Sequence, residues 1–356
     1  MKRLFIIALA LCMCLPLLSA CSKGGENGVV NVFNWGENID KEVLEIFERE
    51  TGIKVNYKTY DSNEILYSKL KTDASSYDVI IPSDYMISRL IEEGMIQKIN
   101  MANVPNISLI GDQFKNQEYD PTGEYSVAYT WGTLGLIYNS SVVSEPVDSW
   151  GLMFDAQYAG QVLQIDNPRD AVAIALIYLG YSINTTEEAE IREAFEFLEG
   201  KKKSGQWQKY VMDQVYDLLE GGEAAIGTYY AGDFLMMYEN NPDLRFVIPK
   251  EGSNRFTDAM CITAGAKNKD NAEAFINFMC DTETCIANMA ETGYASPNTE
   301  AAEAYQDEFD LDVPEEKYQY DIMYPSPEIL DNCEIYVNLP AHINDLYAKL
   351  WGEFRS

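Results

Sequence analysis

Segments with the two-residue period of β-strands alternate along this chain with segments that have the 3.6-residue period of helices. The sequence predicts a strand at 29–33, a helix that begins after Asp40 and ends at Gly52, and a second strand at 53–59. The apolar run 77–82 is continuous, as expected for a strand that is covered on both faces. This alternation favours an α/β fold with helices on both faces of a sheet.

The same alternation continues to the end of the chain, with two apolar runs around Trp131 and Gly132. Further predicted elements are helices at 63–72, 86–93, 171–179, 187–199, 214–220 and 271–280, and strands at 161–165, 223–230 and 245–249. No Gly-rich phosphate loop and no zinc-site spacing is present, so neither a cofactor nor a metal is predicted. The chain has 356 residues, which is too many for one small core and predicts two domains.

The N-terminus has the features of a processing signal. A short basic segment precedes an apolar stretch at 4–18, which is shorter than the about 20 residues that span a bilayer. The stretch ends in LSAC at 18–21, which resembles the lipobox of bacterial lipoproteins. We therefore predict a lipoprotein signal peptide at 1–20, lipidation of Cys21 and a flexible tether at 21–28. The lipid anchor is then the only membrane contact; the alternative is an ordinary signal peptide that contains a cysteine.

The balance of charges limits the partners that this chain can have. Its 57 acidic and 26 basic residues give a formal net charge of −31. Such a charge argues against nucleic acid and anionic membrane surfaces as partners, and it is compatible with a cationic ligand. Of the seven cysteines, Cys12 and Cys14 belong to the predicted signal peptide and Cys21 is the predicted lipidation site. The other four are predicted to be buried free thiols, with a disulfide between two of them left open: Cys261, Cys280, Cys285 and Cys333.

A series of short motifs extends over nearly all of the chain from residue 30 onward. They are WGE at 35–37, ETGIKVNYKTYDSNE at 50–64, YDVIIPSDY at 77–85, EGMIQKI at 93–99, LGYSINTT at 179–186, PKEG at 249–252, AKNKDNAEAFINFM at 266–279 and ETGYASPN at 291–298. In their order and spacing they resemble the spermidine/putrescine-binding receptors of bacterial polyamine ABC importers. The resemblance implies an extracytoplasmic solute-binding protein that is a monomer and is not an enzyme.

The resemblance also implies a fold and a working cycle. The fold is α/β, a two-lobed periplasmic-binding-protein-like fold of type II with the ligand in the interlobe cleft. The N-terminal lobe comprises 29–133 plus 258–302, and the C-terminal lobe comprises 134–257 plus 303–356. The receptor captures its ligand in the open cleft, closes around it by a hinge motion and then docks on the permease subunits of the ABC transporter.

A polyamine consists of ammonium groups that are separated by methylenes, and its binding site has to satisfy both. Each ammonium needs a carboxylate or a set of acceptors, because an unpaired buried charge is strongly destabilising. Aromatic rings pack on the methylenes and also attract the cation. Carried over from the family's pattern, the predicted ligand-binding residues are Trp35, Glu37, Ser83, Tyr85, Asp170, Tyr230, Phe256, Asp258 and Tyr294. Tyr336 falls near a further polar contact of that pattern.

Several of these residues have a purely structural alternative. Ser83 can cap the helix that follows it, Asp170 can be an acid in the first turn of a helix, and Tyr336 can belong to the core. Where the family has an aromatic residue, an acid and two tryptophans, this chain has Asn38, Asn167, Tyr230 and Phe256. These departures leave the choice between a diamine and a triamine open.

Three other functions are compatible with parts of the sequence. The pair Tyr229-Tyr230 is a feature of ferric-iron receptors of similar architecture, although neighbouring residues on a strand point to opposite faces. Glu37 and Asp258 can in principle form the carboxylate pair of a glycoside hydrolase. Nucleophilic catalysis by Ser or Cys is disfavoured because the chain has a single histidine, His342. The third alternative is a surface adhesin with a vestigial cleft.

Overall fold

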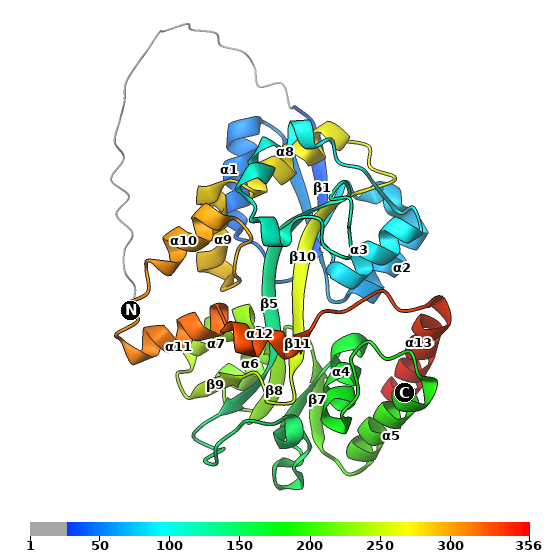
Figure 1. The fold of residues 1–356 in the computed structure, drawn as a ribbon, viewed down its shortest axis with the longest axis vertical. Coiled ribbons are helices and arrows are strands. Elements are labelled where there is room, and N and C mark those ends of the chain that lie inside the picture. The colour runs from blue at the N-terminus through cyan, green and yellow to red at the C-terminus, as the bar shows by residue number, and fades with distance from the viewer. Residues whose placement is uncertain (1–26) are drawn as a thin grey trace, which may run out of the picture.

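Two long strands run through the middle of the molecule and connect its two lobes (Figure 1). In the computed structural model, which describes residues 27–356, these strands are β5 (Ser126–Asn139) and β10 (Ser253–Thr263), and they pair antiparallel. The predicted lobe boundaries at residues 133 and 257 fall within these strands, and that division of the chain stays a prediction. Cys21, the predicted signal peptide and most of the tether lie outside the described residues.

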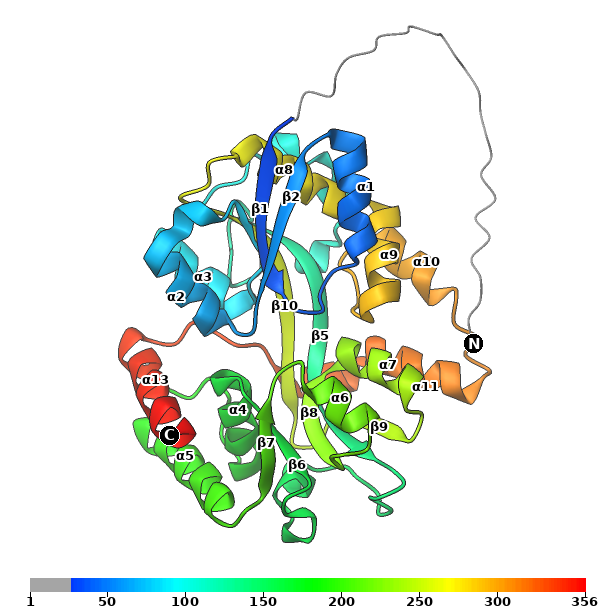
Figure 2. The ribbon, with the colours of Figure 1, turned by 180° about the vertical axis from the view of Figure 1, so that it is seen from behind.

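The lobe that contains the first strand is built on a sheet with the strand order β2-β1-β3-β10-β5. β1 is parallel to β2 and β3, whereas β10 runs antiparallel to β3 and β4. Helices α2 and α3 lie on one side of the strands and α1 and α9 on the other (Figure 2). The elements of this lobe are β1 (Val29–Trp35), α1 (Lys41–Thr51), β2 (Lys54–Tyr60), α2 (Asn63–Asp73), β3 (Val79–Ile80), α3 (Asp84–Glu92), β4 (Ile96–Gln97), α8 (Lys269–Met279), α9 (Thr282–Thr292) and α10 (Thr299–Gln306).

The second lobe continues the sheet in the order β5-β8-β6-β7, and β9 also pairs with β5. Helices α4, α5 and α13 lie on one side of these strands, and α6, α7 and α11 lie on the other (Figures 1 and 2). The elements are β6 (Val162–Ile165), α4 (Pro168–Leu179), α5 (Glu188–Lys203), β7 (Trp207–Val211), α6 (Val215–Glu220), β8 (Ile226–Tyr230), α7 (Ala231–Asn240), β9 (Leu244–Val247), α11 (Pro314–Met323), α12 (Pro327–Asp331), β11 (Cys333–Glu334) and α13 (Ala341–Arg355). The predicted α/β class with helices on both faces is therefore confirmed.

Local sequence signals explain where the first helix begins and ends. The side chain of Asp40 accepts a hydrogen bond from the backbone N–H of Glu42, and Gly52 ends the helix in the left-handed conformation with φ of 71°. Both predictions are confirmed. The predicted strand at 77–82 is shorter than expected, because only Val79–Ile80 forms regular strand pairs with β1. The two apolar runs around Trp131 belong to the single strand β5.

The buried apolar side chains form two cores, of which one lies within the first lobe and the other extends from the α2 and α3 side of that lobe into the second lobe. In the first lobe the rings of Phe47 and Phe275 meet edge to face with centroids 5.4 Å apart. In the second lobe Trp150 is fully buried, and its indole N–H donates to the carbonyl oxygen of Gly252 at 2.8 Å. Within residues 27–356 the four cysteines are buried and unpaired, as predicted, and burial raises the pKa of Cys285 to about 11.

Candidate functional site

A cavity lies between the two lobes and contains about 660 Å³ of empty space, including space open to solvent at its mouth. All nine predicted ligand-binding residues line this cavity, and so does Tyr336. They come from both lobes, with Trp35 at the end of β1 and Tyr230 at the end of β8. The structure therefore brings all of the predicted residues together, whereas their contact with a ligand stays a prediction.

Asp258 is a buried carboxyl on β10, with 5% of its surface exposed. The hydroxyl of Ser83 donates to its Oδ1 at 2.7 Å, and the amide of Asn63 donates to the Ser83 hydroxyl at 3.1 Å. Ser83 occupies the position before α3, but its side chain makes no capping hydrogen bond. The hydroxyl is used to hold Asp258, and burial raises the pKa of Asp258 to about 8.

Asp170 lies in the first turn of α4 and points both oxygens at tyrosines. Oδ2 accepts from the hydroxyl of Tyr230 at 2.7 Å, and Oδ1 accepts from that of Tyr336 at 2.9 Å. Burial raises its pKa to about 6. The guanidinium of Arg169 lies 4.4 Å from the ring centre of Tyr336 and 4.9 Å from that of Tyr85. Asp170 is thus a first-turn acid and also part of the cavity wall, and Tyr336 belongs to the same site.

Aromatic rings form the apolar part of the cavity wall. Tyr230 meets Phe256 edge to face with centroids 5.3 Å apart, and Phe256 meets Tyr294 in the same way at 6.1 Å. Trp35 packs against Tyr60 with centroids 4.7 Å apart. Such a wall can pack on methylene groups and attract a cation at the ring faces.

Three acids that were not among the predicted residues also line the cavity. Asp233 accepts hydrogen bonds from the hydroxyls of Tyr216, at 2.7 Å, and Tyr294. Asp213 accepts from the hydroxyl of Tyr229 at 2.7 Å. Burial raises the pKa of Asp233 to about 7 and also raises that of Asp213. The third acid is Asp61, which is exposed at the cavity edge.

A signal for these acids was present in the sequence. Each of the three follows the carboxyl end of a strand by one to three residues: Asp61 follows β2, Asp213 follows β7 and Asp233 follows β8. Ligands of α/β sheets bind at the carboxyl ends of strands. The predicted strands at 53–59 and 223–230 therefore pointed to two of the three, whereas no strand was predicted before Asp213.

The two tyrosines of the pair Tyr229-Tyr230 make separate hydrogen bonds in the cavity wall. Tyr229 and Tyr230 both line the cavity, because Tyr230 is the last residue of its strand. Their hydroxyls donate to different carboxylates, Asp213 and Asp170. In the described part of the chain no group of three His, Cys, Asp or Glu side chains is arranged to hold a metal ion.

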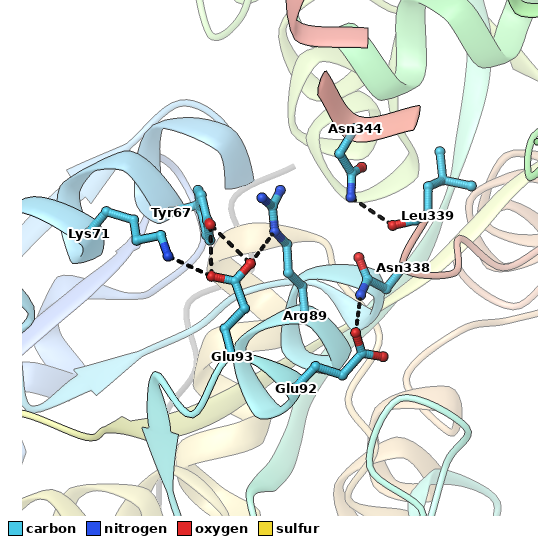
Figure 3. Close-up of polar contacts among 8 residues, drawn as sticks. All are labelled: Tyr67, Lys71, Arg89, Glu92, Glu93, Asn338, Leu339 and Asn344. Carbon is cyan, nitrogen blue, oxygen red and sulfur yellow. Dashed lines mark hydrogen bonds and ion pairs between the residues drawn. The ribbon is translucent and has the colours of Figure 1, made fainter. Parts of the chain in front are cut away.

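The two lobes touch each other around the cavity. The amide of Asn338, in the segment between β11 and α13, donates to Oε2 of Glu92 at the end of α3 at 2.8 Å (Figure 3). The neighbouring Glu93 is held by Lys71 at 2.7 Å and by Arg89 at 3.0 Å, with the hydroxyl of Tyr67 beside them (Figure 3). Lys71 and Tyr67 thereby connect the end of α3 to α2 next to the contact with Asn338.

A two-lobed α/β chain with a polar and aromatic cavity between its lobes has the architecture of a periplasmic binding protein. The match to known families agrees with this class: residues 42–313 fit the family described as bacterial extracellular solute-binding protein. The chain belongs to this family.

Individual relatives extend over most of the chain. The spermidine/putrescine-binding periplasmic protein of Escherichia coli K12 is 34% identical over 345 residues, which cover 96% of each chain. A Listeria monocytogenes protein assigned to a spermidine/putrescine ABC transporter has 36% identity and a TM-score of 0.85, over 92% of this chain and 98% of its own. The TpPotD lipoprotein of Treponema pallidum has 26% identity and a TM-score of 0.79, over 92% and 99%. The resemblance to polyamine receptors is therefore confirmed.

Within residues 27–356, none of the helices combines the length and the apolar character that a bilayer crossing requires.

Proposed function

We propose that this protein is the lipid-anchored solute-binding receptor of a polyamine ABC importer. It binds spermidine or putrescine between its lobes, acts as a monomer, delivers the ligand to the permease subunits and catalyses no reaction. The names of the E. coli and L. monocytogenes relatives support the ligand class and the ABC transporter. The lipobox-like LSAC at 18–21 and the T. pallidum lipoprotein support the anchor at Cys21.

The observation that carries the proposal is the charge balance of the cavity wall. Its acidic side chains are Glu37, Asp61, Asp170, Asp213, Asp233 and Asp258. Among residues 27–356, Arg169 is the only cationic side chain that lines the same cavity. A buried carboxylate without a cationic partner is unstable in its charged form, which is why several of these groups have raised pKa values. A ligand with two or three ammonium groups supplies the missing charge.

A thermal-shift series with putrescine, spermidine and spermine tests this function directly. A ligand at 100 times its Kd stabilises the folded state by about 2.7 kcal/mol, which for a chain of this size raises Tm by roughly 4 °C. Butylamine and 1,4-butanediol serve as controls, because they keep the chain length but lack one or both charges. No shift with any di- or triamine would contradict the proposal.

The Glu92–Asn338 hydrogen bond is expected to contribute a small part of the closure energy. Replacing Asn338 by Ala should weaken polyamine binding about twofold to fivefold, mainly through faster dissociation, because an exposed hydrogen bond contributes about 0.5–1 kcal/mol. Stopped-flow fluorescence measures both rates. The control is Asn332→Ala, which removes a bond to the carbonyl oxygen of Lys250 within one lobe at 2.9 Å. Equal effects of the two substitutions would contradict a role in closure.

A further inference from the structure

Asp213 stands where the cavity opens to the outside. Asp213 and Glu37 line both the inner cavity and the outer part of the cleft between the lobes. Glu37 is exposed, whereas Asp213 is half-buried and its Oδ1 is held by the hydroxyl of Tyr229 at 2.7 Å. The acids shared by the inner cavity and the outer cleft are thus Glu37 of the first lobe and Asp213 of the second, and Asp213 has a fixed position.

Gly36 allows the two lobes to approach each other at this point. A Cβ atom on Gly36 would overlap with Oδ2 of Asp213. The φ angle of Gly36 is not in the left-handed region, so the absence of a side chain matters here for space and not for backbone conformation. The loop between β1 and α1 can therefore rest directly on the Asp213 carboxylate, which leaves the carboxylate facing the residues beside Gly36.

Two acids of the first lobe, Asp61 and Glu37, lie near enough to act on the charge of Asp213, and Lys41 of the same lobe also lines the outer cleft. Burial raises the pKa of Asp213, and the nearby charges of Asp61 and Glu37 raise it further. Like charges that approach across a cleft oppose its closure unless a cation lies between them. On the inner side, burial raises the pKa of Asp233, and the nearby charge of Asp213 raises it further. The acids therefore continue from the mouth into the cavity.

An unused hydrogen-bonding group lies next to this cluster. Asn38, which follows Glu37 in the chain, is only 4% exposed and lines the inner cavity. Neither its Oδ1 nor its Nδ2 has a hydrogen-bond partner among the described residues. A buried amide without partners is destabilising. The Oδ1 of Asn38 can accept a hydrogen bond from an ammonium group, which is a donor without acceptor capacity.

We propose that Asp213 is a specificity-determining residue which, with Glu37 and Asp61 of the opposite lobe and the amide of Asn38, binds one ammonium group at the mouth of the site. This inference rests on the proposed polyamine function. Asp233, held by the hydroxyls of Tyr216 and Tyr294, is close enough to Asp213 to belong with the mouth position. Asp170 and Asp258 form two separate carboxylate positions deeper in the cavity, each held by its own hydroxyl donors. The mouth adds a further position, and the site therefore selects a triamine over a diamine.

Titration calorimetry with spermidine and putrescine on the purified protein tests the assignment. Unsubstituted protein should bind spermidine at least tenfold more tightly than putrescine. Asp213→Asn should weaken spermidine binding about tenfold and putrescine binding less than twofold. Gly36→Ala keeps the charge but displaces the flexible end of the Asp213 side chain. Gly36→Ala is therefore expected to weaken spermidine binding more than putrescine binding, as Asp213→Asn does. Asn38→Leu should also lower spermidine affinity selectively.

The matched control is Glu239→Gln, because Glu239 lines the outer cleft but not the inner cavity. Glu239→Gln removes one negative charge from the outer cleft, as Asp213→Asn does, and should change the affinities for spermidine and for putrescine by less than twofold. Equal losses for the two amines in Asp213→Asn, no loss at all, or a preference of the unsubstituted protein for putrescine would each overturn the inference. Absence of binding to either amine by the unsubstituted protein would instead refute the polyamine function itself.

Discussion

Replacing Asp258 by Asn is expected to weaken polyamine binding at least tenfold. Asp258 is 5% exposed and lines the cavity from β10, so an ammonium group paired with it is shielded from water. Removing one partner of a buried ion pair costs about 3–5 kcal/mol. The pKa of Asp258 is about 8, so the carboxyl is partly protonated when the site is empty. Part of the ion-pair energy is then used to release this proton, and the expected loss of affinity is smaller than about 3–5 kcal/mol. Calorimetry at pH 8 measures the effect.

The same substitution should stabilise the empty protein. The buried carboxylate of Asp258 is unfavourable in its charged form, whereas an amide of the same shape can still accept the Ser83 hydroxyl. Asp258→Asn should therefore raise the Tm of the empty protein at pH 9 and abolish most of the shift that spermidine produces. The exposed Asp312→Asn is the control. An unchanged affinity in Asp258→Asn would remove this residue from the binding site.

Polyamine binding is also expected to weaken strongly as the pH falls. Burial raises the pKa values of three cavity acids, to about 8 for Asp258, about 7 for Asp233 and about 6 for Asp170. Below these values the acids hold protons that must leave before they can pair with ammonium groups. Affinity for spermidine should fall about 100-fold between pH 8 and pH 6, because each pKa unit corresponds to a factor of ten for one proton.

The stability of the empty protein should follow the opposite course. An unfolded Asp has a pKa of about 3.9, so between pH 4 and pH 8 the folded state binds more protons than the unfolded state. Stability of the empty form therefore decreases as the pH rises through this range. Thermal unfolding from pH 5 to pH 8 measures the slope, and Asp258→Asn should flatten it at the upper end. Binding affinity that is constant between pH 6 and pH 8 would contradict the proton linkage.

Parts of the binding site could be predicted because their signals are local. Trp35 and Glu37 belong to the motif WGE at 35–37, at the end of a strand with a clear apolar pattern, and Asp258 was carried over from the family's pattern. Asp213 and Asp233 were not predicted as site residues because neither belongs to a motif shared with the family. Their role depends on which strand ends meet, and Asp213 reaches Gly36 only through the pairing of β7 with β6 and the passage of β5 and β10 between the lobes.

The sequence by itself determined the α/β class and the helix limits at Asp40 and Gly52, and its motifs led to the predicted cavity residues through the resemblance to a family. Those features follow from residue periodicity, capping chemistry and motifs, which act over a few residues. Only the tertiary structure decided that Ser83 holds Asp258 instead of capping α3, and that Tyr336 donates to Asp170. The physical reason is that burial and hydrogen-bond partners are properties of groups that lie far apart in the chain and meet only when both lobes are assembled.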